Sequence, residues 1–118
     1  MMVVRYSKRV NKIAYWTLKI IRYYDANNRG NMTYINSYKV VKFNERLWET
    51  RGKKISPRTI LGIYKTLTCV TESLGGWYLK LHHGWVFALP HRTISKMSDA
   101  ELMSVILNCV LKTTESND

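Results

Sequence analysis

Three basic residues stand immediately before a well-marked helix start in the middle of the chain. Arg51, Lys53 and Lys54 precede Ser56 and Pro57, which are favoured as the N-cap and the first residue of a helix. A helix N-terminus attracts anions, because its free backbone N–H groups point outward and its dipole is positive there. We therefore predict that Arg51, Lys53 and Lys54 contact phosphate groups.

The helix that follows this start has an apolar stripe and a polar remainder. The stripe recurs with helical spacing and comprises Ile60, Ile63, Tyr64, Leu67, Val70 and Leu74. The residues expected to face outward are Ser56, Arg58, Thr59, Gly62, Lys65 and Thr66. If the partner is DNA, these six are the candidates for contact with the edges of its bases. Arg58 has the geometry for a bidentate contact with guanine. Gly62 allows a close approach of the backbone, either to DNA or to another helix.

A stripe of basic residues on the preceding helix is a second candidate for phosphate contact. Lys39, Lys42 and Arg46 recur at i, i+3 and i+7, so they share one side of a helix. The alternative is a solvated face whose cations pair with Glu45 or Glu49.

A hairpin turn supplies a third group of candidates. Lys80, His82 and His83 surround a turn expected at or near His83-Gly84, and they could touch the DNA backbone or minor groove. The same residues also make a good tight turn without any functional role. A metal site at His82, His83 and His91 is not expected, because no carboxylate or cysteine accompanies them.

The charge of the chain favours a polyanionic partner. It holds 19 Lys and Arg against 8 Asp and Glu, for a net charge of +11. Residues 1–92 carry 17 of these cations against 4 acids, whereas residues 93–118 carry 2 against 4. DNA, RNA and acidic membrane surfaces all attract such a field, and a simple solvated basic surface is the remaining alternative.

Other functional classes find little support in the residues. No stretch reaches the length of a membrane span, and the N-terminus lacks the pattern of a signal peptide, so we expect a cytoplasmic protein without a membrane partner. The basic part of the chain has few acids and no DxD or ExK pair, so we expect no enzyme activity, no cofactor and no metal.

Cys69 and Cys109 lack metal-binding spacing and are expected to be small apolar side chains rather than a disulfide. The chain contains no Gln, which favours a thermophilic source.

Periodicity and capping residues predict one domain with an ordered series of elements. The series is a helix over 7–25, a short strand over 32–35, a helix from 36 or 37 to 51, a helix over 56–74, a hairpin over 77–89 and a helix over 98–112. The last helix begins at a capping box formed by Ser98 and Glu101. Residues 90–97 are read as the end of the hairpin and a linker, and residues 113–118 as a frayed tail.

This order resembles that of the winged helix-turn-helix DNA-binding family over residues 7–90. The resemblance implies an α+β, mainly α, fold in which residues 51–55 form the turn, the following helix enters the major groove and the hairpin is a two-stranded wing. The added last helix resembles that of the PadR-like branch. The size and plan are also similar to those of small DNA-binding proteins of archaeal viruses and plasmids, including segregation adaptors. The expected division is residues 1–92 for DNA binding and residues 93–118 for dimerisation.

The last helix is apolar on nearly every side, which predicts that it buries two faces. One face, Leu102, Val105, Ile106 and Cys109, is assigned to the core. The other is assigned to a homodimer interface and comprises Met103, Leu107, Val110 and Leu111. The alternatives are that the helix lies wholly within its own core, or that the interface lies on the first helix, around Trp16, Ile20 and Tyr23.

The leading interpretation is therefore a sequence-specific, double-stranded DNA-binding homodimer. It would act as a transcription regulator or as a plasmid or viral segregation factor, with a further protein partner in the second case. An RNA-binding or ribosome-associated protein is the main alternative, although that class predicts aromatic side chains exposed on a strand, and here Trp77, Trp85 and Phe87 are expected to pack under the wing. A protein interaction module or a small nuclease is a more distant alternative.

Overall fold

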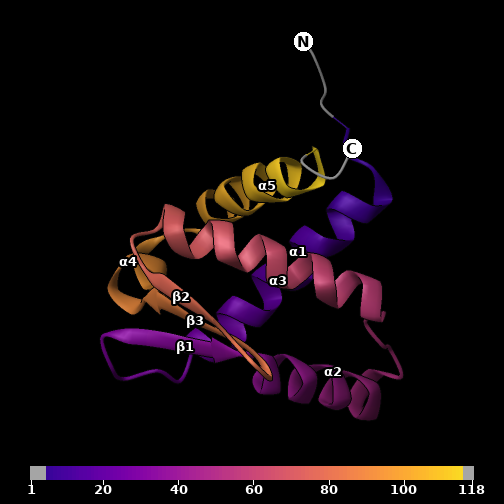
Figure 1. The fold of residues 1–118 in the computed structure, drawn as a ribbon, viewed down its shortest axis with the longest axis horizontal. Helices are drawn as coiled ribbons and strands as arrows, with labels where there is room; N and C mark the ends of the chain where they lie inside the picture. The colour runs from indigo at the N-terminus through magenta and orange to yellow at the C-terminus, as the bar shows by residue number, and fades with distance from the viewer. Residues whose placement is uncertain (1–4, 116–118) are drawn as a thin grey trace.

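The computed structural model describes residues 5–115, which form a mainly helical α+β fold (Figure 1). Its helices are α1 (Lys8–Asp25), α2 (Ser37–Arg51), α3 (Pro57–Ser73), α4 (His91–Lys96) and α5 (Asp99–Glu115). Its strands are β1 (Met32–Asn36), β2 (Trp77–Leu81) and β3 (Gly84–Pro90), which form one antiparallel sheet in the order β1-β3-β2. Within this part of the chain no helix is both long and apolar enough to cross a bilayer.

The predicted helix starts are confirmed by their capping hydrogen bonds. The side chains of Ser7, Asn36 and Ser56 each accept a hydrogen bond from a backbone N–H three residues later. At the start of α5, the backbone N–H groups of Ser98 and Glu101 each donate to the other residue's side chain. Hydrogen bonding from the backbone and the side chain of Ser98 to the carboxylate lowers the pKa of Glu101. Local side-chain chemistry therefore sets where these helices begin.

Three element boundaries differ from the prediction. The hairpin turn consists of His82 and His83, since Leu81 and Gly84 are already paired as strand residues. The expected linker contains the short helix α4, which follows directly on β3. Helix α5 continues to Glu115, so the expected frayed tail is helical over 113–115, and its last residues, 116–118, lie outside the described residues.

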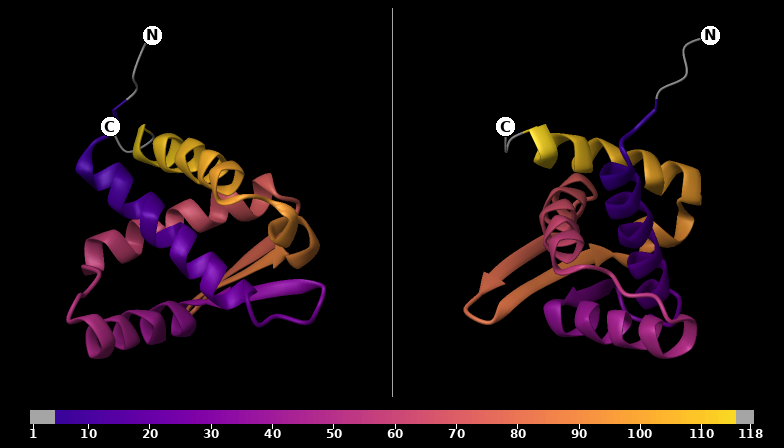
Figure 2. Two further views of the ribbon diagram at one scale, coloured as in Figure 1. Left: turned by 180° about the vertical axis from the view of Figure 1, so that it is seen from behind. Right: turned by 90° about the vertical axis from the view of Figure 1, so that its right-hand side faces the viewer.

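One hydrophobic core joins the sheet to all the long helices. The inner sheet face contributes Ile35, Phe87 and Leu89, which are fully buried. The hairpin of β2 and β3 extends beyond this core, and its turn projects away from the helices in the right-hand view of Figure 2. The far end of the hairpin is therefore open to a partner.

Helix α5 belongs to this core and lies against α1 and α3 (Figures 1 and 2). Leu102, Ile106 and Cys109 are buried as predicted, whereas Val105 is only half-buried. Val110 is also fully buried, so its assignment to a dimer interface is wrong. The expected boundary between residues 92 and 93 does not separate two cores. Between Asp99 and Thr113, no large apolar side chain is among the exposed ones.

A disulfide between Cys69 and Cys109 ties α3 to α5, with the two Cα atoms 5.6 Å apart. The expectation of two ordinary apolar cysteines is therefore wrong. The error arose because the cysteines are 40 residues apart and the sequence does not reveal that α5 returns to α3. Disulfides persist in oxidising compartments and inside hyperthermophiles.

Removing this disulfide should destabilise the fold. For Cys69→Ala combined with Cys109→Ala, we expect the free energy of unfolding to fall by about 4 kcal/mol, because a closed loop of this length no longer restricts the unfolded chain. Guanidinium unfolding with and without reductant measures the change. Reductant should shift the midpoint of the natural chain and leave that of the double variant in place. Free thiols in the unreduced natural chain would contradict the assignment.

Candidate nucleic-acid interface

The turn between α2 and α3 is held by the side chain of Asn44. Its amide nitrogen donates to the carbonyl oxygen of Ile55 at 3.0 Å, and its carbonyl oxygen accepts from the N–H of Ile55 at 2.8 Å. The side chain of Ile55 is buried. Ile55 is thus fixed both by its backbone hydrogen bonds and by its buried side chain, and the preceding Lys53 and Lys54 are exposed to solvent. The role of Asn44 could not be predicted, because a polar residue in a helix does not reveal in the sequence which loop it will contact.

The chain changes direction at the end of α2, where the turn begins. Gly52 adopts a left-handed conformation with φ of 63°, which a side chain would disfavour. Arg51, Lys53 and Lys54 are all exposed around it. The three predicted phosphate ligands are therefore accessible together, next to the N-terminus of α3.

Three of the six predicted base-contacting residues face the core. Ser56, Arg58 and Lys65 are exposed, whereas Thr59, Gly62 and Thr66 are buried, so the prediction that these last three face outward is wrong.

The buried threonines satisfy their own hydroxyl groups. Thr66 donates to the carbonyl oxygen of Gly62 at 2.8 Å, four residues earlier in the same helix. Thr59 accepts a hydrogen bond from the hydroxyl of Ser56 at 3.0 Å. With its hydroxyl paired locally, each threonine packs its methyl group in the core.

Gly62 makes the close helix contact that was the alternative to DNA. A methyl group at this position would lie 2.6 Å from Cδ1 of Ile13 on α1. The exposed side of α3 instead includes Leu61, which lies between Arg58 and Lys65 and was not predicted. A leucine here could contact a thymine methyl group.

The basic stripe on α2 is mostly engaged within the molecule. Lys39 donates to the carbonyl oxygen of Tyr34 at 2.8 Å. Lys42 lies 3.4 Å from a carboxylate oxygen of Glu45, and the negative charge of Glu45 raises the pKa of Lys42. Arg46 lies over the ring of Tyr23, with its guanidinium carbon 6.0 Å from the ring centroid. These partners favour the alternative of a solvated, internally paired face.

A groove of about 400 Å³ between α1 and α2 was not predicted. Its lining combines aromatic and basic side chains and comprises Tyr15, Trp16, Lys19, Arg22, Tyr23, Phe43, Arg46, Leu47, Thr50 and Arg51. The alternative dimer interface on α1 comprised Trp16, Ile20 and Tyr23. Of these, Ile20 is fully buried and therefore unavailable for a contact with a second copy. The cations of the groove would also oppose self-association there.

The predicted wing residues are all exposed, but their neighbours differ from the expectation. His82 and His83 form the turn, and Lys80 lies over the ring of Trp85 at 5.1 Å from its centroid. Phe87 is buried and Trp85 half-buried under the hairpin, as expected. Trp77 is exposed on the opposite sheet face, so its predicted place under the wing is wrong.

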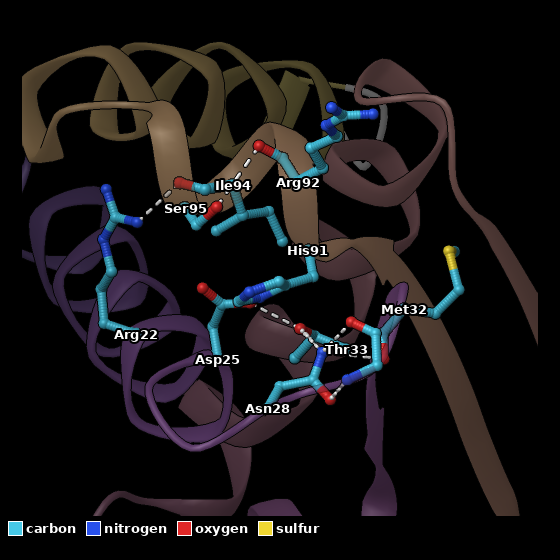
Figure 3. A network of polar contacts seen from close by, with 10 residues as sticks. Arg22, Asp25, Asn28, Met32, Thr33, His91, Arg92, Ile94 and Ser95 are labelled. Atoms are coloured by element: carbon cyan, nitrogen blue, oxygen red, sulfur yellow. Dashed lines mark hydrogen bonds and ion pairs between the residues drawn. The ribbon is translucent and has the colours of Figure 1, made fainter.

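A buried polar network joins α1, β1 and α4 around Asp25 (Figure 3). One carboxylate oxygen of Asp25 accepts from the hydroxyl of Thr33 at 2.5 Å and lies 2.6 Å from Nδ1 of His91. Asn28 donates to the same hydroxyl at 2.9 Å. Nearby, Arg22 donates to the carbonyl oxygen of Ile94, which fixes α4 against α1. These hydrogen bonds hold the structural elements together, and each of the polar side chains has a partner within the network.

No group of three or more His, Cys, Asp or Glu in the described chain is placed to hold a metal ion. No family model, curated protein or solved structure matches the chain. The functional interpretation therefore depends on the surface itself.

The Asp25 network should contribute far more to stability than an exposed ion pair. We expect Asp25→Ala to lower the free energy of unfolding by about 2–3 kcal/mol, because it leaves buried polar partners without an acceptor. The control is Asp99→Ala, which removes an ion pair to Arg22 from a side chain that is 73% exposed, against 7% for Asp25. That change should cost less than about 1 kcal/mol. Equal losses in denaturant unfolding would show that the network is not a special anchor.

Proposed function

We propose that this protein binds double-stranded DNA through the α2–α3 turn and the exposed side of α3. The observation that carries the proposal is the charge of this surface. Its exposed charged residues are Arg51, Lys53, Lys54, Arg58 and Lys65. No acidic residue occurs between Glu49 and Glu72 in the sequence. A helix N-terminus surrounded by these cations would match the phosphate backbone in charge, and the exposed Arg58 would reach a base edge.

The arrangement of elements supports a winged helix-turn-helix mode of binding. Helix, strand, two helices joined by a tight turn, and a hairpin follow one another in the order of that family. The strand order β1-β3-β2 places the hairpin beside the first strand. In this mode α3 would lie in the major groove while the hairpin turn, with His82 and His83, would lie along the backbone.

The protein would act without a cofactor as a homodimer that reads a two-fold symmetric site. The biological role would be transcription regulation or plasmid or viral DNA segregation, the latter with a further protein partner. A cytoplasmic location belongs to the same proposal and requires a cytoplasm that tolerates the disulfide, such as that of a hyperthermophile. The absence of Gln is consistent with such a source.

Selection from random-sequence duplexes followed by footprinting tests the function directly. We expect one recurring sequence with two-fold symmetry, since a dimer presents two copies of α3. Enrichment of no sequence, together with binding that salt does not affect, would contradict DNA recognition and favour a protein interaction module. Plasmid incubated with magnesium should stay intact, because cleavage would reveal a nuclease.

RNA binding is the second candidate because two aromatic side chains are exposed on a sheet face. Tyr34 and Trp77 lie there with their ring centroids 6.0 Å apart. Single-stranded RNA is commonly bound by bases stacking on such rings. Competition between a duplex DNA and an RNA of the same sequence distinguishes the two candidates, and we expect the duplex DNA to win.

Arg58 should contribute to sequence preference. We expect Arg58→Ala to weaken binding to the selected duplex by about 1–3 kcal/mol while changing binding to an unrelated duplex much less. Arg29→Ala is the matched control, because it removes the same charge from the exposed loop between α1 and β1. Fluorescence anisotropy on both duplexes measures the difference. An equal loss on the two duplexes would assign Arg58 to the phosphates.

Lys53 should contribute to affinity without regard to sequence. It is a cleaner test than Lys54, which shares a shallow pocket with Glu45 and Glu49. We expect Lys53→Gln to weaken binding similarly on every duplex and to reduce the slope of log affinity against log salt by about one. Lys112→Gln, near the end of α5, should leave the slope unchanged. An unchanged slope for Lys53→Gln would mean that the turn faces solvent in the complex.

A further inference from the structure

The outer face of the sheet, opposite the core, exposes several large apolar side chains in the part of the chain that the structure describes. Because side chains alternate along a strand, the register places one set of residues together on this side. This outer sheet face comprises Tyr34, Asn36, Trp77, Leu79, Leu81, Val86 and Ala88. The exposed fractions of its large side chains are 48% for Tyr34, 45% for Trp77, 51% for Leu79 and 49% for Leu81. Contiguous apolar surface of this kind marks an interaction site.

The charge of this face does not suit a nucleic acid. None of its residues is Lys or Arg, although the chain as a whole carries +11. Binding of DNA or RNA strands combines aromatic stacking with cations that follow the phosphates. Lys80, the one charged residue of β2, points to the other side of the sheet and lies over Trp85. The outer sheet face therefore fits a protein surface.

Strand β2 forms an open edge along this face. It pairs with β3 on one side, and four of its five residues are exposed. An edge strand offers unpaired N–H and C=O groups to another strand. Trp77, Leu79 and Leu81 alternate along it, so a strand that pairs there would also meet the apolar side chains.

We propose that β2, with its outer-face side chains Trp77, Leu79 and Leu81, forms the interface with a second copy of this chain. Leu79 is the middle residue of β2, so antiparallel pairing about a two-fold axis at Leu79 would place Trp77 of each copy beside Leu81 of the other. Such a contact is self-complementary, as a two-fold dimer requires. Two copies that each carry +11 repel over most of their surface, whereas the outer side of β2 is uncharged and its one cation, Lys80, lies on the other side of the sheet over Trp85. The inference refines the homodimer of the proposed function and moves its interface away from α5.

Sedimentation equilibrium without DNA tests the interface separately from DNA binding. We expect the natural chain to sediment as a dimer at micromolar concentration and Leu79→Glu to halve the mass, with an unchanged circular dichroism spectrum. Val41→Glu is the matched control, because Val41 is 48% exposed on α2, and it should remain dimeric. Leu107→Glu on α5 should also remain dimeric. A monomeric natural chain, a dimeric Leu79→Glu, or loss of the dimer in Leu107→Glu but not in Leu79→Glu would overturn the proposal.

Hydrogen exchange of the natural chain provides a test that needs no variant. We expect the backbone N–H groups of β2 to exchange more slowly when the concentration rises from nanomolar to micromolar. Those of the exposed first turn of α5 should exchange at the same rate throughout. Protection that rises with concentration on α5 and not on β2 would overturn the proposal, even if Leu79→Glu proved unable to fold.

Discussion

The close crossing of α1 and α3 at Gly62 is the contact on which the placement of α3 and α5 depends. Because Gly62 has no side chain, Ile13 occupies the space that a Cβ would fill, and the two helices approach closely. α5 then packs against both helices and is tied to α3 by the disulfide. With one side of α3 held in this way, Arg58 and Lys65 face solvent on the other side. The position of the basic surface is thus set from within the core.

Most element boundaries could be predicted because their causes are local. Ser56 and Ser98 each form the capping bond that the sequence predicts, and Ser7 and Asn36 form one at the predicted starts of their helices. Helix α4 could not be predicted in the same way. Its six residues give too little periodicity to recognise, and its N-cap residue, Pro90, supplies no side-chain hydrogen bond. What holds α4 is tertiary, namely Arg22 and Asp25 reaching from α1.

The exposure of the candidate site residues was predicted correctly where charge decides it and wrongly where it does not. Arg58 and Lys65 are exposed, since burying an unpaired cation is costly. Thr59 and Thr66 were interpreted as polar and therefore external, but a threonine whose hydroxyl is paired locally can be buried without leaving that hydroxyl unpaired. The prediction for Trp77 was wrong for a similar reason, because a large apolar side chain does not always face the core. Helix faces that depend on such residues need the tertiary structure.

Charged and apolar surfaces are separated in this molecule, and salt acts on them in opposite directions. The turn and the N-terminal part of α3 carry five exposed cations, so added salt would weaken their proposed attraction for phosphates by reducing the gain from counterion release. The outer sheet face carries no charge, so association there is opposed only by the net charge of each copy, and salt screens that repulsion. A hairpin with a basic outer face would have coupled the two effects. In the proposed mode of binding, α3 and the turn would attract DNA, and the apolar side chains of β2 would serve assembly.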